Sequence, residues 1–201
     1  MRSSIRRSDG RQRPRAIARA RRGFSILELT VVLIMMSIVA GMAIPRVNYQ
    51  RYRADAAMRS VRTVLQGAER NAIMRQTDVV VGFDVAGKRL VILEDANNNC
   101  TADNGERVSV RPLEEGAQFK LPSAAYPNTS PSSAVSGSNL CTMKGYPSVQ
   151  FLRDGAASTD VDVYITSGRA AVGDYRMVRV LQAGGRTETY RYSGTAWGRY
   201  N

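Results

Sequence analysis

The sequence predicts an α+β protein: a long N-terminal helix, with a transmembrane half and an amphipathic half, followed by an antiparallel β-sheet or sandwich head. Two patterns carry this prediction. Apolar side chains follow helical spacing over residues 24–76, and from Thr77 they alternate with a period of two. Runs of strand-forming residues then recur between Gly- and Asp-containing turns. A helix followed by a series of strands is typical of the α+β class.

The first 23 residues form a strongly basic segment. They carry nine Arg and one acid, Asp9, and so account for +8 of the formal net charge of +12. The rest of the chain is mildly basic, at +4. A high pI usually indicates nucleic acid or an anionic surface as a partner, but here it mainly reflects this first segment.

Residues 24–44 form an apolar run of 21 residues that is interrupted by Ser25, Glu28, Thr30 and Ser37. A helix of this length, at about 1.5 Å per residue, spans roughly the 30 Å hydrocarbon core of a bilayer. Because Arg residues are concentrated before the run, we expect the N-terminus in the cytoplasm and the C-terminal part outside it. A cleavable signal peptide and a plain signal anchor are the alternatives.

The helical pattern continues over residues 45–76. Apolar positions three and four residues apart predict one buried stripe, made of Ala57, Val61, Val64, Leu65, Ala68 and Ala72. We therefore expect one helix from Phe24 to about Gln76 that is kinked near Pro45. Its second half is expected to pack against the head.

Residues 77–201 are expected to form the β-rich head. Eight stretches have the composition of strands, namely 79–83, 90–93, 107–113, 117–121, 149–152, 161–165, 177–181 and 188–192. Turn residues such as Asp154-Gly155 separate them. The stretch 121–148 is rich in Ser, Pro and Gly and lacks periodicity, so we expect a long surface loop there.

Residue usage argues against an enzyme. The chain has no His, which is the commonest general base and metal ligand. It has neither a Gly-x-Ser-x-Gly nucleophile motif nor a phosphate-binding loop. Its three Lys would allow a Ser–Lys pair, but no motif supports one. We therefore expect no catalytic residues and no cofactor.

The start of the apolar run resembles the processing signature of type IV prepilins and type II secretion pseudopilins. The matching residues are Gly23-Phe24-Ser25-Ile26-Leu27-Glu28-Leu29 after the basic segment, with Pro45 where the family usually has a helix-kinking Pro. The resemblance implies a leader of residues 1–23, cleavage by prepilin peptidase between Gly23 and Phe24, and N-methylation of Phe24. Ser37 departs from the family, many of whose members have Gly there.

Glu28 is the fifth residue of the implied mature chain. A charge inside a membrane-length apolar segment is costly. Cleavage creates a positive amine on Phe24, and opposite charges attract strongly in a low dielectric. The resemblance implies that Glu28 of an incoming subunit pairs with this amine of a subunit already in the filament, and that Pro45 also serves assembly. A Glu that merely extends to the membrane interface is the alternative.

The head resembles the GspH/FimT group of minor pilins and pseudopilins. Two weaker motifs carry this likeness: the strand–acidic loop–strand segment VILEDANNNCTADNGERVSV, and Gly185-Arg186 before a final strand. The likeness implies three partners: other pilin or pseudopilin subunits, the prepilin peptidase and an inner-membrane assembly platform. The head is then expected in the periplasm and afterwards in a pilus or pseudopilus.

The acidic loop has two interpretations. Oxygen-bearing side chains occupy positions 1, 3, 5, 9 and 12 of a calcium-loop count, namely Asp95, Asn97, Asn99, Asp103 and Glu106. The sixth position, which requires Gly in such loops, is Cys100, and the flanks are strand-like. Asn and Asp are also ordinary turn residues, so we favour a plain hairpin loop over a calcium site.

The chain has two Cys, Cys100 and Cys141. In an oxidising periplasm they would form a disulfide across the loop, with two reduced thiols as the alternative. Closing a loop of some 40 residues would stabilise the fold by roughly 3–4 kcal/mol.

The C-terminal part mixes Arg with aromatic residues, which suits a nucleic-acid backbone and exposed bases. Some FimT-like minor pilins bind DNA through a Gly-Arg-x-Arg element, so Arg186 and Arg191 are the candidate contacts. This chain reads Gly185-Arg186-Thr187-Glu188, with an acid in place of the second Arg. A solvated strand face is therefore the favoured interpretation.

The leading interpretation is a structural subunit of a type IV pilus or a type II secretion pseudopilus. One alternative is a DNA-binding minor pilin that acts in DNA uptake, which Glu188 weakens. The other is a membrane-anchored periplasmic domain that never polymerises, which Glu28 argues against.

Overall fold

The computed structural model describes residues 23–43, 49–114, 116–124, 126, 127, 129 and 131–200. The chain divides into two compact units, Met1–Val47 and Asn48–Asn201, and each is described by itself. Three predicted features lie outside the described residues: the leader over residues 1–22, the end of the apolar run at Ile44, and the kink at Pro45.

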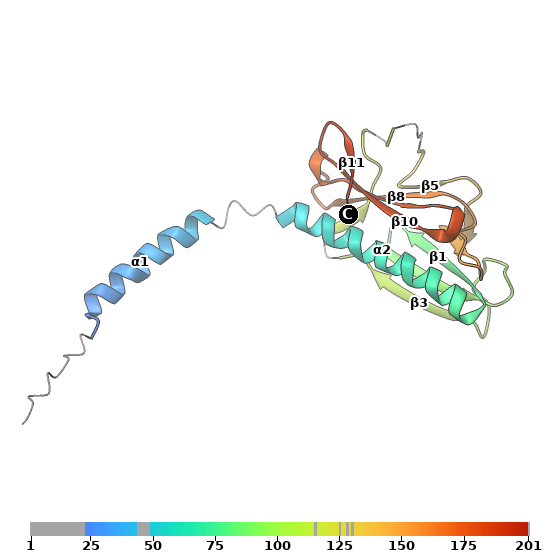
Figure 1. Cartoon of the computed structure of the whole chain (residues 1–201), viewed down its shortest axis with the longest axis horizontal. Helices are drawn as coiled ribbons and strands as arrows, with labels where there is room; N and C mark the ends of the chain where they lie inside the picture. Colours follow the sequence, from blue (N-terminus) through green and yellow to red (C-terminus); the bar gives the residue numbers. More distant parts are fainter. Residues whose placement is uncertain are drawn as a thin grey trace, which may run out of the picture. The chain divides into compact units, whose positions relative to one another are not determined.

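The first unit contains helix α1, Ile26–Ala43 (Figure 1). Ser25 caps it, since its Oγ accepts a hydrogen bond from the Leu27 amide at 3.3 Å; Ser is a preferred residue at this position. No helix in the described parts of the chain is long and apolar enough to cross a membrane.

The second unit begins with helix α2, Tyr49–Arg75, which presents the predicted stripe to the head. Its buried residues are Ala54, Ala57, Met58, Val61, Leu65, Ala68 and Ala72, and Val64 is partly buried beside them. Gln76 ends the helix in the left-handed conformation, with φ of 54°, and the Thr77 amide donates to the Ala72 carbonyl at 3.3 Å. This is a common helix C-terminal motif.

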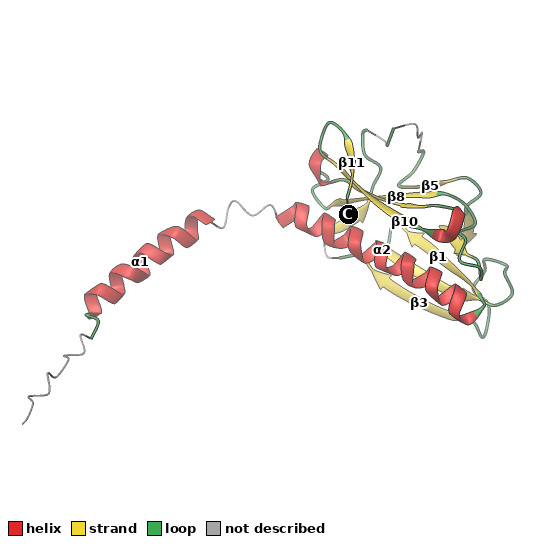
Figure 2. Cartoon of the chain, in the orientation of Figure 1, coloured by secondary structure: helices red, strands yellow, loops and turns green. Residues whose placement is uncertain are grey.

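Two antiparallel sheets make up the rest of the head (Figures 1 and 2). The first, sheet A, has the order β3-β2-β1-β7-β6, and the second, sheet B, has the order β11-β10-β9-β8-β4, with β5 also paired to β8. In sheet A the strands are β1 Asp78–Asp84, β2 Arg89–Asp95, β3 Arg107–Pro112, β6 Cys141–Met143 and β7 Tyr146–Phe151. In sheet B they are β4 Ala117–Phe119, β5 Val135–Gly137, β8 Val161–Ser167, β9 Arg176–Val180, β10 Thr187–Tyr192 and β11 Trp197–Arg199. Two short 3₁₀ turns, η2 Val172–Asp174 and η3 Ala183–Gly185, flank β9.

The main core joins α2 to both sheets. It combines the buried stripe of α2 with side chains such as Phe83 of β1, Phe151 of β7 and Val163 of β8, all fully buried. Phe83 meets Phe119 edge to face, with ring centroids 6.0 Å apart. Burying an aliphatic or Phe side chain contributes about 1.5–3 kcal/mol, so helix and sheets stabilise one another. The predicted α+β class is confirmed.

Every predicted strand is present, with ends that differ by at most three residues. The expected long loop over residues 121–148 needs correction, because it contains β5 and β6 and the first residues of β7. β11 was also not predicted. Strands of three residues are too short to show a period of two; they exist because they pair with longer neighbours, as Val135 does with Val163.

Candidate functional site

The predicted processing site lies directly before α1. Gly23 and Phe24 precede the helix, and the Phe24 side chain is 80% exposed. Glu28 lies in the first helical turn, where a negative charge interacts favourably with the helix dipole. The residues predicted for cleavage, methylation and assembly are therefore at one helix end, except Pro45, which lies outside the described residues.

The other polar side chains of α1 are satisfied within the helix. Thr30 Oγ1 donates to the Leu27 carbonyl at 2.8 Å, and Ser37 Oγ donates to the Leu33 carbonyl at 2.8 Å. Glu28 is the one charged residue of α1, and it has no hydrogen-bond or ion-pair partner among the residues that the structure describes. Among the polar side chains of α1, the Glu28 carboxylate is therefore the one available to bind a group from outside the helix.

Large apolar side chains of α1 are exposed around the helix. Examples are Ile26 at 85%, Met35 at 64% and Val39 at 67%. Exposed apolar area of this extent favours burial in an apolar surrounding. Among the described residues of the first unit, α1 is the one helix, so it has no second element there to pack against.

The acidic loop between β2 and β3 is organised by its own hydrogen bonds. Asp95 is fully buried, and its two carboxylate oxygens accept the amides of Asn99 at 3.2 Å and Cys100 at 2.7 Å. The Glu106 carboxylate accepts the amides of Ala96 at 2.9 Å and Asp103 at 3.0 Å. These bonds fix the loop as a hairpin connection.

The remaining calcium candidates, Asn97, Asn99 and Asp103, bind each other. Both amide groups donate to Asp103 Oδ2, at 2.8 and 2.7 Å, and these bonds lower the pKa of Asp103. Within the described part of the chain, no three His, Cys, Asp or Glu side chains are grouped so as to hold a metal ion. The hydrogen bonds within the loop favour the plain hairpin, and the calcium site remains a hypothesis.

Cys100 and Cys141 form a disulfide, with Cα atoms 6.3 Å apart. It joins the acidic loop to β6, on the face of sheet A where Val80, Leu93 and Met143 form a second small core. The bond closes a segment of 41 residues.

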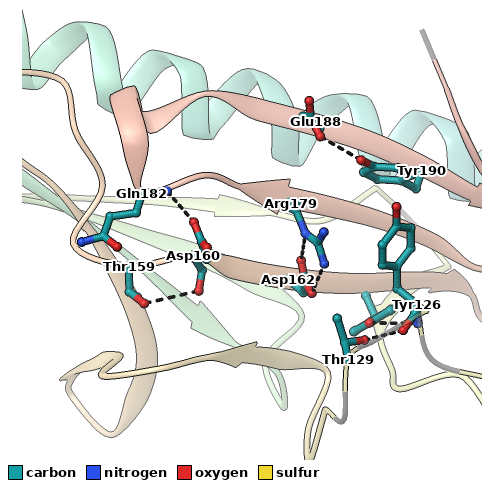
Figure 3. Close-up of polar contacts among 10 residues, drawn as sticks. Tyr126, Thr129, Thr159, Asp160, Asp162, Arg179, Gln182, Glu188 and Tyr190 are labelled. Carbon is teal, nitrogen blue, oxygen red and sulfur yellow. Dashed lines mark hydrogen bonds and ion pairs between the residues drawn. The ribbon is translucent and has the colours of Figure 1, made fainter.

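On sheet B, charged side chains form pairs across neighbouring strands (Figure 3). Arg179 of β9 donates from Nε and Nη2 to both carboxylate oxygens of Asp162 on β8, at 2.7 and 2.8 Å. This bidentate pair raises the pKa of Arg179 because it stabilises the charged guanidinium. Beside it, Asp160 accepts the Gln182 amide at 2.7 Å.

Aromatic side chains cover the same face. Tyr126 packs edge-on against Tyr190 and Trp197, with centroids at 4.8 and 6.3 Å. The Arg179 guanidinium lies 4.6 Å from the centre of the Tyr126 ring, a cation–π geometry. Burial, together with a hydrogen bond to Glu188, raises the pKa of Tyr190. These rings are therefore engaged with one another rather than arranged as a free stacking surface.

Most arginines of the C-terminal part are paired with carboxylates. The pairs are Arg169 with Asp174, Arg176 with Asp55, Arg179 with Asp162, and Arg199 with Glu188. The two DNA candidates, Arg186 and Arg191, have no ion pair among the described residues. Arg191 lies opposite Arg176 in the β9–β10 register, whereas Arg186 precedes β10 and is exposed. The DNA interface stays a hypothesis that rests on these two side chains.

The pairs between strands could not be read from the sequence. Asp162 and Arg179 are 17 residues apart, and Glu188 and Arg199 are 11 apart. Which acid faces which Arg depends on strand register, and the alternation of charged residues in the predicted strands was the one available signal.

The chain is similar to a family of transport proteins and to a pilin-like protein. Residues 57–184 match the family model described as Type II transport protein GspH. Pilin-like protein PilA1 of Thermus thermophilus is 34% identical over 100 residues, which cover 48% of this chain and 62% of that protein. The match thus spans less than two thirds of that relative's length.

Two solved structures are also similar to the chain. The minor pseudopilin EpsH from the type 2 secretion system of Vibrio cholerae has a TM-score of 0.46 and 17% identity, covering 68% of this chain and 95% of that one. The type IV minor pilin FimU of Pseudomonas aeruginosa has a TM-score of 0.45 and 14% identity, covering 68% and 87%. The relatives named here are thus a pilin-like protein, a minor pseudopilin and a type IV minor pilin.

Proposed function

The chain belongs to the GspH family and is of the minor pilin or pseudopilin type, and on this premise we propose that it is made as a precursor and assembled into a filament. In this proposal prepilin peptidase cuts between Gly23 and Phe24, and Phe24 is N-methylated. The basic segment before Gly23 is the leader that is removed.

Before assembly, residues 24–44 anchor the chain in the inner membrane. The basic leader keeps the N-terminus in the cytoplasm, so the head lies in the periplasm. The exposed apolar side chains around α1 support this part of the proposal. Lipid covers them first, and neighbouring subunits cover them after assembly.

The observation that carries the proposal is Glu28, the one charged residue of α1, which has no partner among the described residues. In an apolar surrounding an isolated carboxylate is strongly disfavoured. The amine of Phe24 on a neighbouring subunit supplies the missing positive charge, and methylation of an amine leaves that charge in place. Pairing would therefore favour assembly and fix the axial position of each subunit.

The filament is a type II secretion pseudopilus or a type IV pilus. The family description names type II transport, and the Thermus relative is named as pilin-like. A strain that lacks the protein distinguishes these two filaments. Loss of secretion of a folded protein indicates a pseudopilus, and loss of surface pili indicates a pilus.

The test is filament incorporation of two Glu28 variants, Glu28→Ala and Glu28→Gln. We expect both to insert into the membrane and to be cleaved, but to be absent from sheared filaments. Ser37→Ala is the matched control, because Ser37 is a polar residue of the same helix whose hydroxyl binds its own backbone. Incorporation of Glu28→Ala at the level of the control would overturn the assembly role of Glu28.

A further inference from the structure

Strand β3 is an unprotected edge of sheet A. It pairs with β2 on one side (Figure 1), and all six of its residues, Arg107–Pro112, are exposed. Among the described residues no other strand pairs with it. An edge strand presents a row of unpaired backbone groups, which is a template for another strand.

The register shows which backbone groups of β3 face outward. The Leu113 amide donates to the Lys88 carbonyl at 2.9 Å, and hydrogen-bonded pairs alternate along an antiparallel ladder. Arg107, Ser109 and Arg111 therefore bond to β2, whereas Val108 and Val110 direct their amides and carbonyls away from the sheet. Pro112 has no amide, so the outward ladder of donors ends at Val110.

The side chains of β3 add an apolar face to this ladder. Val108 is 38% exposed and Val110 is 47% exposed. In register they lie opposite Leu93 and Val91 of β2, which are buried in the second small core. The two valines thus extend a buried apolar surface to the rim of the sheet, where part of it is left uncovered.

The opposite face of β3 is basic. Arg107 and Arg111 lie four residues apart, and neither has an ion pair among the described residues. Glu94 faces Arg107 in register, but its carboxylate binds Arg75 of α2 at 2.7 Å. Strand β3 therefore carries Arg107 and Arg111 on one face, and the apolar residues Val108 and Val110, which lie between them in the sequence, on the other.

This charge pattern disfavours a second copy of the chain. If two β3 strands paired antiparallel in the register that matches both valines, Arg107 of each copy would face Arg111 of the other. Like charges directly opposite destabilise a strand pair, whereas opposite charges stabilise it. The two arginines therefore disfavour pairing of β3 with β3 of a second copy and favour pairing with a strand that carries acidic residues.

We propose that the β3 edge binds an extended segment of a partner protein by antiparallel strand addition. The segment carries acidic residues at two positions four apart, facing Arg107 and Arg111, and apolar residues facing Val108 and Val110. This interaction goes beyond subunit assembly through α1, and it requires neither cleavage at Gly23 nor Glu28.

The test uses the full chain in detergent and a fluorescent synthetic peptide with the core Glu-Val-Thr-Val-Glu. Val110→Pro removes an outward amide while leaving the β2 ladder intact, and Pro is tolerated at such edge positions. The double variant Arg107→Glu/Arg111→Glu reverses the charge of the rim. Arg186→Glu is the control, because it reverses an exposed Arg outside sheet A. Thermal unfolding of each variant checks that the head is folded.

We expect peptide binding that weakens about tenfold in Val110→Pro and in the double variant, and that is unchanged in Arg186→Glu. A peptide with Lys in place of Glu should bind the double variant better than the original chain. Three results would overturn the proposal: no binding at millimolar peptide, equal binding by all variants, or concentration-dependent self-association of the original chain that Val110→Pro abolishes.

Discussion

Arg176 of β9 is fully buried and donates a hydrogen bond from Nε to the carboxylate of Asp55 on α2. Its Nη1 donates to the carbonyls of Gly173 at 3.1 Å and Tyr175 at 2.8 Å. The Asp55 side chain is 15% exposed. The buried Arg176 guanidinium and the Asp55 carboxylate thus join sheet B to α2 by an ion pair that is largely shielded from solvent.

Removal of one partner of this pair should destabilise the head strongly. In Asp55→Ala the Arg176 guanidinium stays buried without a counter-charge, and such changes cost about 3–5 kcal/mol. Urea unfolding of the variant and the original chain measures the loss. The control is Arg199→Ala, which removes an exposed partner of Glu188 and should cost less than about 1 kcal/mol. Equal effects of the two substitutions would contradict the role assigned to the buried pair.

The turn between β1 and β2 should make stability depend on acid pH. The Asp84 carboxylate accepts the Gly87 amide and pairs with Arg89 Nε, both at 2.7 Å, and these contacts lower its pKa. A lowered pKa gives stability that is present above the unfolded-state value, near 4, and is lost as pH falls through the folded-state value. The Tm difference between the original chain and Asp84→Asn should therefore shrink from pH 5 to pH 2. A constant difference over this range would refute the prediction.

The disulfide should contribute measurably to stability. Reduction frees a 41-residue segment, and the chain-entropy estimate for a loop of that size is about 3–4 kcal/mol. Intact mass should differ by about 2 Da between oxidised and reduced protein, because two hydrogens are gained. The double variant Cys100→Ser/Cys141→Ser should unfold at the same urea concentration with and without reductant. If reductant still lowered the stability of that variant, the loss of stability could not be attributed to the Cys100–Cys141 bond.

Calcium should not stabilise the acidic loop. Asp95 and Glu106 already accept backbone amides with both carboxylate oxygens, so a cation would have to displace these bonds. We expect the same Tm in millimolar calcium and in excess chelator. A rise of several degrees in calcium, reversed by chelator, would restore the calcium interpretation of Asp95, Asn97, Asn99, Asp103 and Glu106.

The order of elements followed from local pattern. The stripe from Ala57 to Ala72 has helical spacing, and residues 79–83 form a run of strand-forming residues, so the end of α2 and both ends of β1 lie within one residue of the prediction. The helical spacing comes directly from backbone geometry, whereas β1 is buried on both faces and shows no alternation.

Contacts that depend on register were not predictable in this way. From the sequence alone, Glu188 was interpreted as an acid that replaces the second Arg of a Gly-Arg-x-Arg element and weakens DNA binding. In the structure Glu188 forms an ion pair with Arg199, between the paired strands β10 and β11. Likewise, no local pattern shows that β3 is an edge strand, because edge position depends on sheet order. The link between Asp55 and Arg176 spans 121 residues and follows only from the packing of α2 on sheet B.

The central claim is processing at the start of α1, and the direct test is intact mass with N-terminal sequencing of the protein recovered from host membranes. The proposal predicts a chain that begins at N-methylated Phe24, with residues 1–23 absent. A chain that begins at Met1 would contradict it, and so would one that begins after residue 40, which would indicate a cleaved signal peptide and a free periplasmic head.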